Sequence, residues 1–573
     1  MTSLGVRKFR SLLLVSCFSL GMAGLAEIVD SAIAGHVLGA SALGAIGLFW
    51  PVVELVYFVA VGLGGGSSVL YSAAAGANDP REMARVFSNG LFSSLTLGIL
   101  LMTALYAGRD QIIAFFGADA ATSALAADYW NGYLANAALY PLYSYLSTMV
   151  TSDGDERISS VAFAVAFVAD TVLSFVLCRC LGIAGCAYGT VAGTVAGMLV
   201  LAGHFRRPSN SYRLCRFFSP RRAWKAFRID LSESVNSLLA TAVYAFLGWY
   251  LAAWSGPGSL PVLTVVVSTH GLMLFLYGVG SALRPVVSVY HAEGDVPAVR
   301  RVMRDAMRVS AVLGFALGAV LFAWPELPSR LVGLDDPALV AAANVPVRWI
   351  GASFPCYSLV ILLVSYYVFV GRRRLSMALV VLAEAVLPIA GGWAGHLLGG
   401  PRGFWFGYAL APSLTFALAM LPALLPRRSR PPFYLVTDAS SGFHDFALAV
   451  EAKAVCEVSD AVRRKLLELG ESAAVGIRAA MLVEESLMAV CEVNGRRRCS
   501  SEVSLDVRDG TVRLILRDDG EVFDLSHDTP GVEVVRGLVL DSSLKALDAR
   551  FGYATLGLNR NAFVLRESTD HRR

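Results

Sequence analysis

The chain has 573 residues, of which 56% are hydrophobic and 16% are charged, and its mean hydropathy is +0.59. A soluble protein of this length carries about 25% charged residues, so the composition excludes an ordinary soluble enzyme and indicates a membrane protein. The net charge of +4 is small, and the nine scattered cysteines contain no Cys-x-x-Cys pair. These cysteines support neither a disulfide framework nor a zinc site.

Apolar stretches predict twelve membrane-spanning helices, because about 20 apolar residues cross a bilayer. They lie at 11–35, 43–72, 86–107, 129–151, 158–180, 183–204, 231–254, 262–288, 305–324, 346–370, 376–397 and 403–425. Lys and Arg gather between alternate spans, above all in the link after residue 204. By the positive-inside rule, we expect a multi-pass protein of the plasma (inner) membrane with both termini in the cytoplasm. This topology explains the basic link without a nucleic-acid partner.

The first apolar stretch, Ser11 to Val37, contains two acids, Glu27 and Asp30. A carboxylate at the centre of a membrane helix costs about 2.5–3.5 kcal/mol on insertion scales, so a retained one usually faces a cavity or an ion path. Spaced three residues apart, the two acids share a helix face. We expect an ion- or proton-binding site in a transporter. The alternative is that the helix ends early and both acids lie in the outer headgroup region.

Other polar residues also fall inside predicted spans and are candidates for lining a cavity. Their alternative role is hydrogen-bonded packing between helices. They are Glu54, Asn236, His270 and Glu384.

The membrane region repeats itself. The segment 153–159 resembles 370–376, and 76–80 resembles 293–297, each pair 217 residues apart. Each repeat holds six predicted helices, so both halves have the same orientation. We therefore expect an N-lobe at 1–210 and a C-lobe at 211–426, with a binding site between them near the midplane.

Several segments together resemble multidrug and toxic compound extrusion (MATE) transporters. They are VDSAIAGHVLGASALGAIGL at 29–48, GLGGGSSVLYSAAAGANDPREMARVF at 62–87 and SALRPVVSVYHAEGD at 281–295. The resemblance implies twelve helices in two bundles and no enzymatic activity. It also implies alternating-access export of small organic, cationic amphipathic compounds, driven by an H⁺ or Na⁺ gradient without a further cofactor. Asp30 matches the acid that carries the coupling cation, and Asp170 would be its partner across the cavity. Asp170 could instead lie at the surface of its helix.

The composition changes after residue 426. A basic, proline-rich linker at 427–432 precedes a predicted α+β cytoplasmic domain at 433–573. The pattern predicts a strand at 432–436, helices at 451–469 and 472–493, and a helix at 532–540 before two final strands. Asp509-Gly510 predicts a hairpin turn between two alternating strands.

This domain resembles the histidine-kinase-like ATP-binding fold, in the branch of anti-sigma-factor serine kinases. LVEESLMAV at 482–490, DDGEVFD at 518–524 and LGLN at 556–559 correspond to its motifs. The resemblance gives Glu485 the role of a base, and Asp518 and Gly520 the recognition of adenine. Ala489 stands where the family has a magnesium-binding Asn, and residues 536–540 lack the usual Gly-x-Gly. We therefore expect a degenerate domain that binds nucleotide weakly or binds a partner protein. An active ATPase or kinase, or a cap that only stabilises the inner face, are the alternatives.

The sequence thus predicts a cation-coupled exporter with a regulatory cytoplasmic domain. A flippase for a lipid-linked intermediate and a membrane-anchored signalling protein remain alternatives. The absence of a Gly-x4-Gly-Lys-Ser/Thr loop argues against an ATP-driven pump.

Overall fold

The computed structural model describes residues 3–424 apart from 77–78, 154, 208–209 and 211. It also describes residues 443–566 apart from 496–498, 509–510, 522–548 and 556–557. The first part is helical. Its elements are α1 (Leu4–Leu38), α2 (Ala40–Gly76), α3 (Pro80–Phe115), α4 (Ala120–Ser152), α5 (Glu156–Leu181), α6 (Ile183–Ala202), α7 (Pro220–Ser255), α8 (Leu260–Gly271), α9 (Leu274–Glu293), α10 (Val296–Ala323), α11 (Leu327–Leu331), α12 (Pro337–Phe369), α13 (Arg373–Val381) and α14 (Leu387–Leu424).

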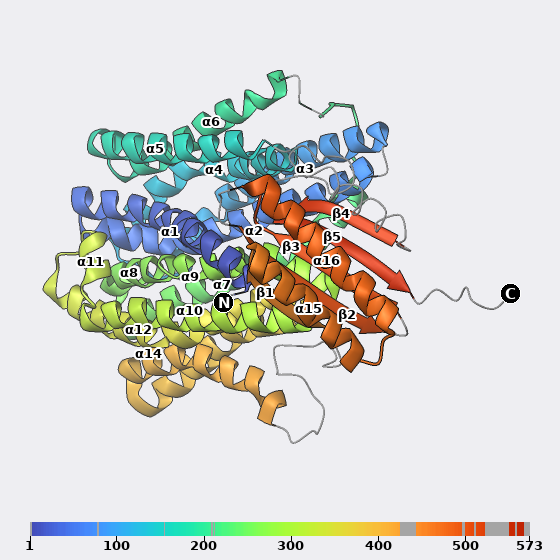
Figure 1. Ribbon diagram of the computed structural model, residues 1–573. Coiled ribbons are helices and arrows are strands. Elements are labelled where there is room, and N and C mark those ends of the chain that lie inside the picture. Colours follow the sequence, from blue (N-terminus) through green and yellow to red (C-terminus); the bar gives the residue numbers. More distant parts are fainter. Residues whose placement is uncertain are drawn as a thin grey trace.

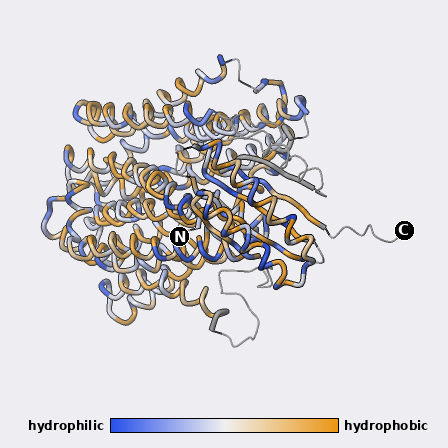
Figure 2. The backbone as a smooth tube through the Cα atoms, in the orientation of Figure 1, coloured by the Kyte–Doolittle hydropathy of each residue, from blue (hydrophilic) through white to orange (hydrophobic). Residues whose placement is uncertain are grey.

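Within the described residues, ten helical stretches are long and apolar enough to cross a bilayer, so the chain is a multi-pass membrane protein. Hydrophobic residues cover most of each of these helices, as Figure 2 shows. The helix α4 is not among the ten. The stretch from Arg373 to Leu421 is interrupted at Gly399 and Gly400, whose φ angles of −145° and +63° are not helical.

Two predicted spans are less regular than the sequence indicated. The span expected at 262–288 is divided into α8 and α9 at Leu272 and Met273. The span expected at 376–397 contains a π-helical turn, Leu382–Val386, between α13 and α14. Single π turns inside α-helices occur frequently at functional sites.

The helices form a bundle in which α3 to α6 lie on one side and α10, α12 and α14 on the other, with α1, α2 and α7 to α9 between them (Figure 1). Glycines let the central helices touch. A Cβ atom at Gly24 of α1 would overlap the carbonyl oxygen of Gly271, and one at Gly66 of α2 would overlap the backbone of Ala226 on α7. Such close backbone contact is typical of membrane helix packing.

The helix α1 contacts both halves of the chain. Its first part packs on α9, where Cys17 lies against Gly278 and Gly21 lies against Phe275. Its second part reaches α6, where Asp30 accepts a hydrogen bond from Thr190. A shift of one half relative to the other must therefore act on α1.

The described residues from 443 to 566, here called the tail, form a five-stranded antiparallel sheet with two helices. The elements are β1 (His444–Ala449), α15 (Ala452–Glu468), α16 (Ala473–Asn494), β2 (Ser500–Arg508), β3 (Thr511–Asp518), β4 (Ala549–Thr555) and β5 (Leu558–Arg566). The strand order is β1-β2-β3-β5-β4. α15 and α16 cover one face of the sheet (Figure 1) and share a hydrophobic core with it.

The structure confirms both predicted tail helices near 451–493 and the β2–β3 hairpin, in which Arg508 pairs with Thr511. The two final strands are also present as β4 and β5. The strand predicted at 432–436 and the helix at 532–540 lie outside the described residues. The first described strand is β1, which the sequence pattern did not indicate.

The second face of the tail sheet is buried as well. Along β2, Glu502 and Ser504 are fully buried and Asp506 is 7% exposed, although they alternate with the core residues Val503 and Leu505. Such alternation is typical of a strand with one face in water. Here that polar face packs on the turn between α9 and α10, whose charged side chains form ion pairs and hydrogen bonds with it.

Those partners form a buried ion network between the tail and the membrane helices. Arg517 of β3 pairs with Glu293 and lies 3.3 Å from Asp295, and Arg560 of β5 also pairs with Glu293. Arg301 of α10 bonds the tail carboxylates Asp445 at 2.6 Å and Glu502 at 3.0 Å. A further ion pair of 3.2 Å joins Arg7 of α1 to Asp519. The sheet is thus attached to α1, α9 and α10 at once.

Candidate functional site

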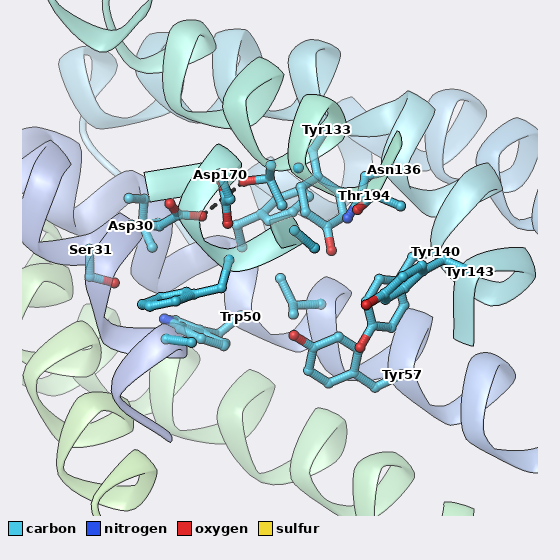
Figure 3. Close-up of a pocket in the computed structure, with 18 of the residues that line it drawn as sticks. Asp30, Ser31, Trp50, Tyr57, Tyr133, Asn136, Tyr140, Tyr143, Asp170 and Thr194 are labelled. Atoms are coloured by element: carbon cyan, nitrogen blue, oxygen red, sulfur yellow. Dashed lines mark hydrogen bonds between the residues drawn. The ribbon is translucent and has the colours of Figure 1, made fainter. Parts of the chain in front are cut away.

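A cavity of about 400 Å³, here called the first cavity, lies among α1, α2, α4, α5 and α6. Its polar wall holds Asp30 and Ser31 from α1, Asp170 from α5 and Thr190 from α6. Tyr133, Tyr140 and Tyr143 of α4 line the remainder together with Trp50 and Tyr57 of α2, as Figure 3 shows.

The two predicted acids of the first cavity are held by short hydroxyl contacts. Thr190 Oγ1 donates to Asp30 Oδ2 at 2.9 Å, and Ser174 Oγ donates to Asp170 Oδ1 at 2.9 Å. Asp30 Oδ1 is buried and has no hydrogen-bond partner among the described residues. The two carboxylates are close enough to interact electrostatically. One free acceptor oxygen therefore remains beside a second acid.

The backbone of α6 makes room for this pair. Gly193 follows Thr190 by one turn, and a Cβ atom there would lie 2.7 Å from the Cβ of Asp170. Because glycine has no side chain, α5 can approach α6 closely enough to turn Asp170 towards α1. The surface position that was the alternative for Asp170 is not what the structure shows.

The charge of the first cavity favours a cation. None of the described residues that line it is Lys or Arg. Two buried carboxylates repel each other unless a proton or another cation lies with them. In the part of the chain that the structure describes, no group of three His, Cys, Asp or Glu side chains could hold a metal ion. The pair suits a proton, a monovalent cation or an organic cation, and aromatic faces attract the last of these.

A second cavity of about 230 Å³ adjoins the first, and Trp50, Tyr57 and Ser237 line both. The structure places all four sequence-predicted cavity candidates on its wall. They are Glu54 of α2, Asn236 of α7, His270 of α8 and Glu384 of the π-helical turn.

Tyrosines surround the acids of this second cavity. Tyr357 donates to Glu384 Oε1 at 2.7 Å, and its hydroxyl lies 3.4 Å from that of Tyr277. The hydroxyl of Tyr408 is 3.4 Å from Nε2 of His270, whose Nδ1 is buried without a partner among the described residues. The second cavity thus holds two further carboxylates and several hydroxyl groups.

Glu27 lies on α1, but its side chain is outside the part of the structure that is described. The sequence also gave no signal for Thr190, nor for the pair in which Thr194 donates to Asn136 at 2.8 Å. Threonine inside an apolar helix has no distinctive pattern. Its spacing from an acid on another helix is not visible in the chain.

In the tail, Asp518 and Gly520, two of the three residues proposed for nucleotide binding, lie together at the end of β3. Asp518 is 3% exposed, and its Oδ1 already accepts from the backbone of Gly520 at 3.0 Å and from Asn559 at 2.9 Å. Burial raises the pKa of Asp518 to about 6. Gly520 lies against Asn494, and Glu485 lies on α16. The segment 536–540 is outside the described residues.

Comparison with known proteins identifies the membrane part. A family model described as MatE matches residues 16–176 and 234–393, together more than half of the chain. The probable multidrug resistance protein YoeA of Bacillus subtilis is 24% identical over 313 residues, which cover 52% of this chain and 65% of YoeA. The chain thus spans slightly less than two thirds of that relative. The probable multidrug resistance protein NorM of Thermotoga maritima is 22% identical over 337 residues, covering 56% of this chain and 71% of NorM.

Solved structures show the same fold. The inward-facing conformation of a multidrug resistance MATE family transporter of the MOP superfamily aligns with a TM-score of 0.63 at 20% identity. The alignment covers 70% of this chain and 96% of that one. The outward-facing conformation of such a transporter gives a TM-score of 0.57, covering 73% and 96%. Taken with the match of the family model, the fold leads to one conclusion: this chain belongs to the MatE family.

Proposed function

We propose that the protein exports small organic, cationic amphipathic compounds by alternating access, coupled to entry of H⁺ or Na⁺. The observation that carries the proposal is the pair Asp30 and Asp170 in a cavity with aromatic walls and no described Lys or Arg. Relatives named for multidrug resistance support this choice. Transport of this kind needs neither an enzymatic step nor a further cofactor.

The proposed topology has twelve crossings with both termini in the cytoplasm of the plasma (inner) membrane. The ten candidate spans become twelve when α4 is added and the stretch from Arg373 to Leu421 is divided at Gly399 and Gly400. α4 has 33 residues, which is long enough to cross a bilayer. Four of its tyrosines and Asn136 line the first cavity, and these polar groups lower its hydropathy. An even number of crossings agrees with the contact between Arg7 and the tail.

In the proposed mechanism, the substrate and the coupling ion compete for the same carboxylates. A cationic substrate near Asp30 and Asp170 satisfies their charge, and an entering H⁺ or Na⁺ displaces it. Because either cation satisfies the pair, the lobes can change orientation when it is loaded, whereas an empty pair leaves uncompensated buried charge. The adjoining second cavity, with Glu54 and Glu384, extends the cation-binding site towards the second half of the chain.

The test is transport of a fluorescent organic cation in proteoliposomes under imposed H⁺ and Na⁺ gradients. We expect gradient-dependent uptake in the wild type without ATP, and its loss in Asp30→Asn. The matched control is Asp110→Asn, which removes an acid that is exposed at the end of α3. A melting temperature measured for each variant separates loss of transport from loss of folding. Uptake by folded Asp30→Asn at the wild-type rate under both gradients would contradict the proposal.

We further propose that the tail regulates transport. Its sheet is bound to α1 through Arg7 and to the α9–α10 turn through Arg517 and Arg560. α1 also carries Asp30, 23 residues or about 35 Å of helix from Arg7. A docked tail therefore holds α1 against α9 and opposes its movement. We expect Arg517→Met to undock the tail and raise the transport rate, while gradient dependence is kept.

The control for this second test is Arg513→Met, which changes an arginine of the same strand that has no ion pair among the described residues. If the two variants transport at the same rate, the tail does not restrain the transporter. A weakly bound nucleotide or a partner protein is the proposed signal for the tail. The comparisons support neither a lipid flippase nor a signalling protein.

A further inference from the structure

An apolar groove of about 650 Å³, here called the inner groove, lies outside both cavities. It is formed by α2 and α3 from the first half of the chain and by α7 from the second. It extends from Leu100, near the middle of α3, to the start of α7. The lining side chains on α7 and just before it are Phe218, Pro220, Ala223, Trp224, Phe227 and Leu231.

The inner groove offers almost no polar group. Its two hydroxyl side chains, Ser93 and Thr96, donate to carbonyl oxygens of their own helix at 2.6 and 2.7 Å. Several lining residues are open to the surroundings, with Trp224 59% and Leu100 58% exposed. From Ser93 to Leu100 the groove follows α3 for about 10 Å at 1.5 Å per residue. In a membrane protein, such a surface suits a hydrocarbon chain.

Cations lie directly beside the groove on α7. The groove residues of this helix recur every three or four positions and so share one face. Arg221, Lys225 and Arg228 fall on the neighbouring stripe, are exposed, and form no ion pair with any described residue. Arg222 differs, because it pairs with Glu82. Three positive charges without an ion pair to a described residue therefore adjoin an apolar groove at the start of α7.

We propose that the inner groove binds an anionic phospholipid of the membrane. One acyl chain fills the groove, and the phosphate group lies at Arg221, Lys225 and Arg228. Charge complementarity selects this occupant, because the cations repel a cationic amphiphile and gain less from a zwitterionic lipid. The ring of Trp224 stacks on Phe227 at 5.9 Å between centroids and closes one side.

The position of the groove gives the lipid a role in transport. At the same level, α2 and α7 touch through Gly66 and Ala226, so the groove lies on the seam between the two halves. A lipid bound there contacts both halves and favours the arrangement that keeps the groove open. Lipid binding is measured without transport, so a lack of lipid binding is distinguishable from a lack of export.

The test uses quenching of Trp224 fluorescence by brominated acyl chains. The full chain is reconstituted in phosphatidylcholine with a small fraction of brominated phosphatidylglycerol or brominated phosphatidylcholine. The difference between wild type and Trp224→Phe isolates this residue from the other eight tryptophans. We expect brominated phosphatidylglycerol to quench at a mole fraction at least about fivefold lower than brominated phosphatidylcholine. One surface cation alone contributes about that factor in affinity for an anionic lipid.

Variants separate the cations from the groove. In the triple variant Arg221→Gln, Lys225→Gln, Arg228→Gln, we expect the two brominated lipids to quench at about the same mole fraction. The control is the triple variant Arg372→Gln, Arg373→Gln, Arg374→Gln, which removes three exposed charges after α12. We expect it to keep the wild-type difference between the two lipids.

Filling the groove is the complementary test. Ala223→Phe should weaken quenching by both lipids, because the added ring occupies the space of the acyl chain. Equal quenching by the two lipids in the wild type would overturn the proposal. So would equal effects of the two triple variants, or full displacement of the signal by soluble glycerol phosphate.

Discussion

Replacing Arg517 by methionine tests the docking of the tail most sharply. The Arg517 side chain is 2% exposed, pairs with Glu293 and Asp295, and lies 4.5 Å above the ring of Tyr290. Methionine keeps the apolar length of the side chain but leaves two buried acids without this cation. Breaking a buried pair from one side costs about 3–5 kcal/mol. Because Arg560 also pairs with Glu293, we expect the lower end, about 3 kcal/mol.

A loss of about 3 kcal/mol corresponds to an increase of about 100-fold in the undocked fraction. Docking is measured by maleimide labelling of Ala562→Cys, a position on the docked face of β5 that is 1% exposed. Cys499, buried in the core of the tail, reports unfolding of the tail in the same sample. We expect labelling at position 562 to rise about 100-fold in Arg517→Met while Cys499 stays protected. An equal rise in Arg513→Met would show that the ion pairs of Arg517 do not hold the tail in place.

Three further predictions follow from other contacts. Burial raises the pKa of Asp295 to about 7, above its value in an undocked chain, so docking is strongest at low pH and is lost as the pH rises through about 7. Labelling relative to an exposed cysteine should therefore increase between pH 5 and 8, and Asp295→Asn should abolish that increase. Gly66→Leu should destabilise the α2–α7 contact by about 1–3 kcal/mol and lower the melting temperature, whereas Gly258→Leu, at a site with open space, should not. Tyr357→Phe removes a donor to the buried Glu384 at a cost of roughly 1.5–3 kcal/mol, and this loss should shrink in a Glu384→Gln background; additive losses would contradict the hydrogen bond.

The acids of the membrane site were visible in the sequence because their surroundings are apolar. Asp30 and Glu384 stand out in stretches that otherwise cross a bilayer, and a retained charge there points to function. Their hydrogen-bond partners could not be found in this way. Thr190 is an ordinary residue in an apolar helix, and only folding brings it to Asp30.

Local irregularities of the helices were also beyond the sequence pattern. The break between α8 and α9 at Leu272 and Met273 directly follows Gly271, but Gly24 and Gly66 lie inside helices that stay unbroken. The π-helical turn at Glu384 precedes Pro388, whose ring crowds the carbonyl of Glu384, but Pro51 and Pro285 lie inside helices without such a turn. Hydropathy reports how long an apolar stretch is, and tertiary contacts decide where its backbone departs from an α-helix.

The docked face of the tail illustrates a different limit. Alternation along β2 separates Glu502 and Ser504 from Val503 and Leu505, and this correctly divides the strand into two faces. It does not show what covers each face. The partners are Tyr290, which donates to Glu502 at 3.0 Å, and other residues of the α9–α10 turn about 200 positions away. From the sequence alone, a polar strand face is expected to lie in water, because the residues that cover it are far away in the chain.

The proposed mechanism requires that substrate and coupling ion compete at Asp30 and Asp170. The most direct measurement is proton release on substrate binding, recorded in weakly buffered detergent solution with and without Na⁺. We expect an organic cation to release protons from the wild type, or to displace Na⁺ when Na⁺ is the coupling ion. In Asp30→Asn we expect neither. Unchanged substrate affinity and ion release in the folded Asp30→Asn variant would contradict the proposed mechanism.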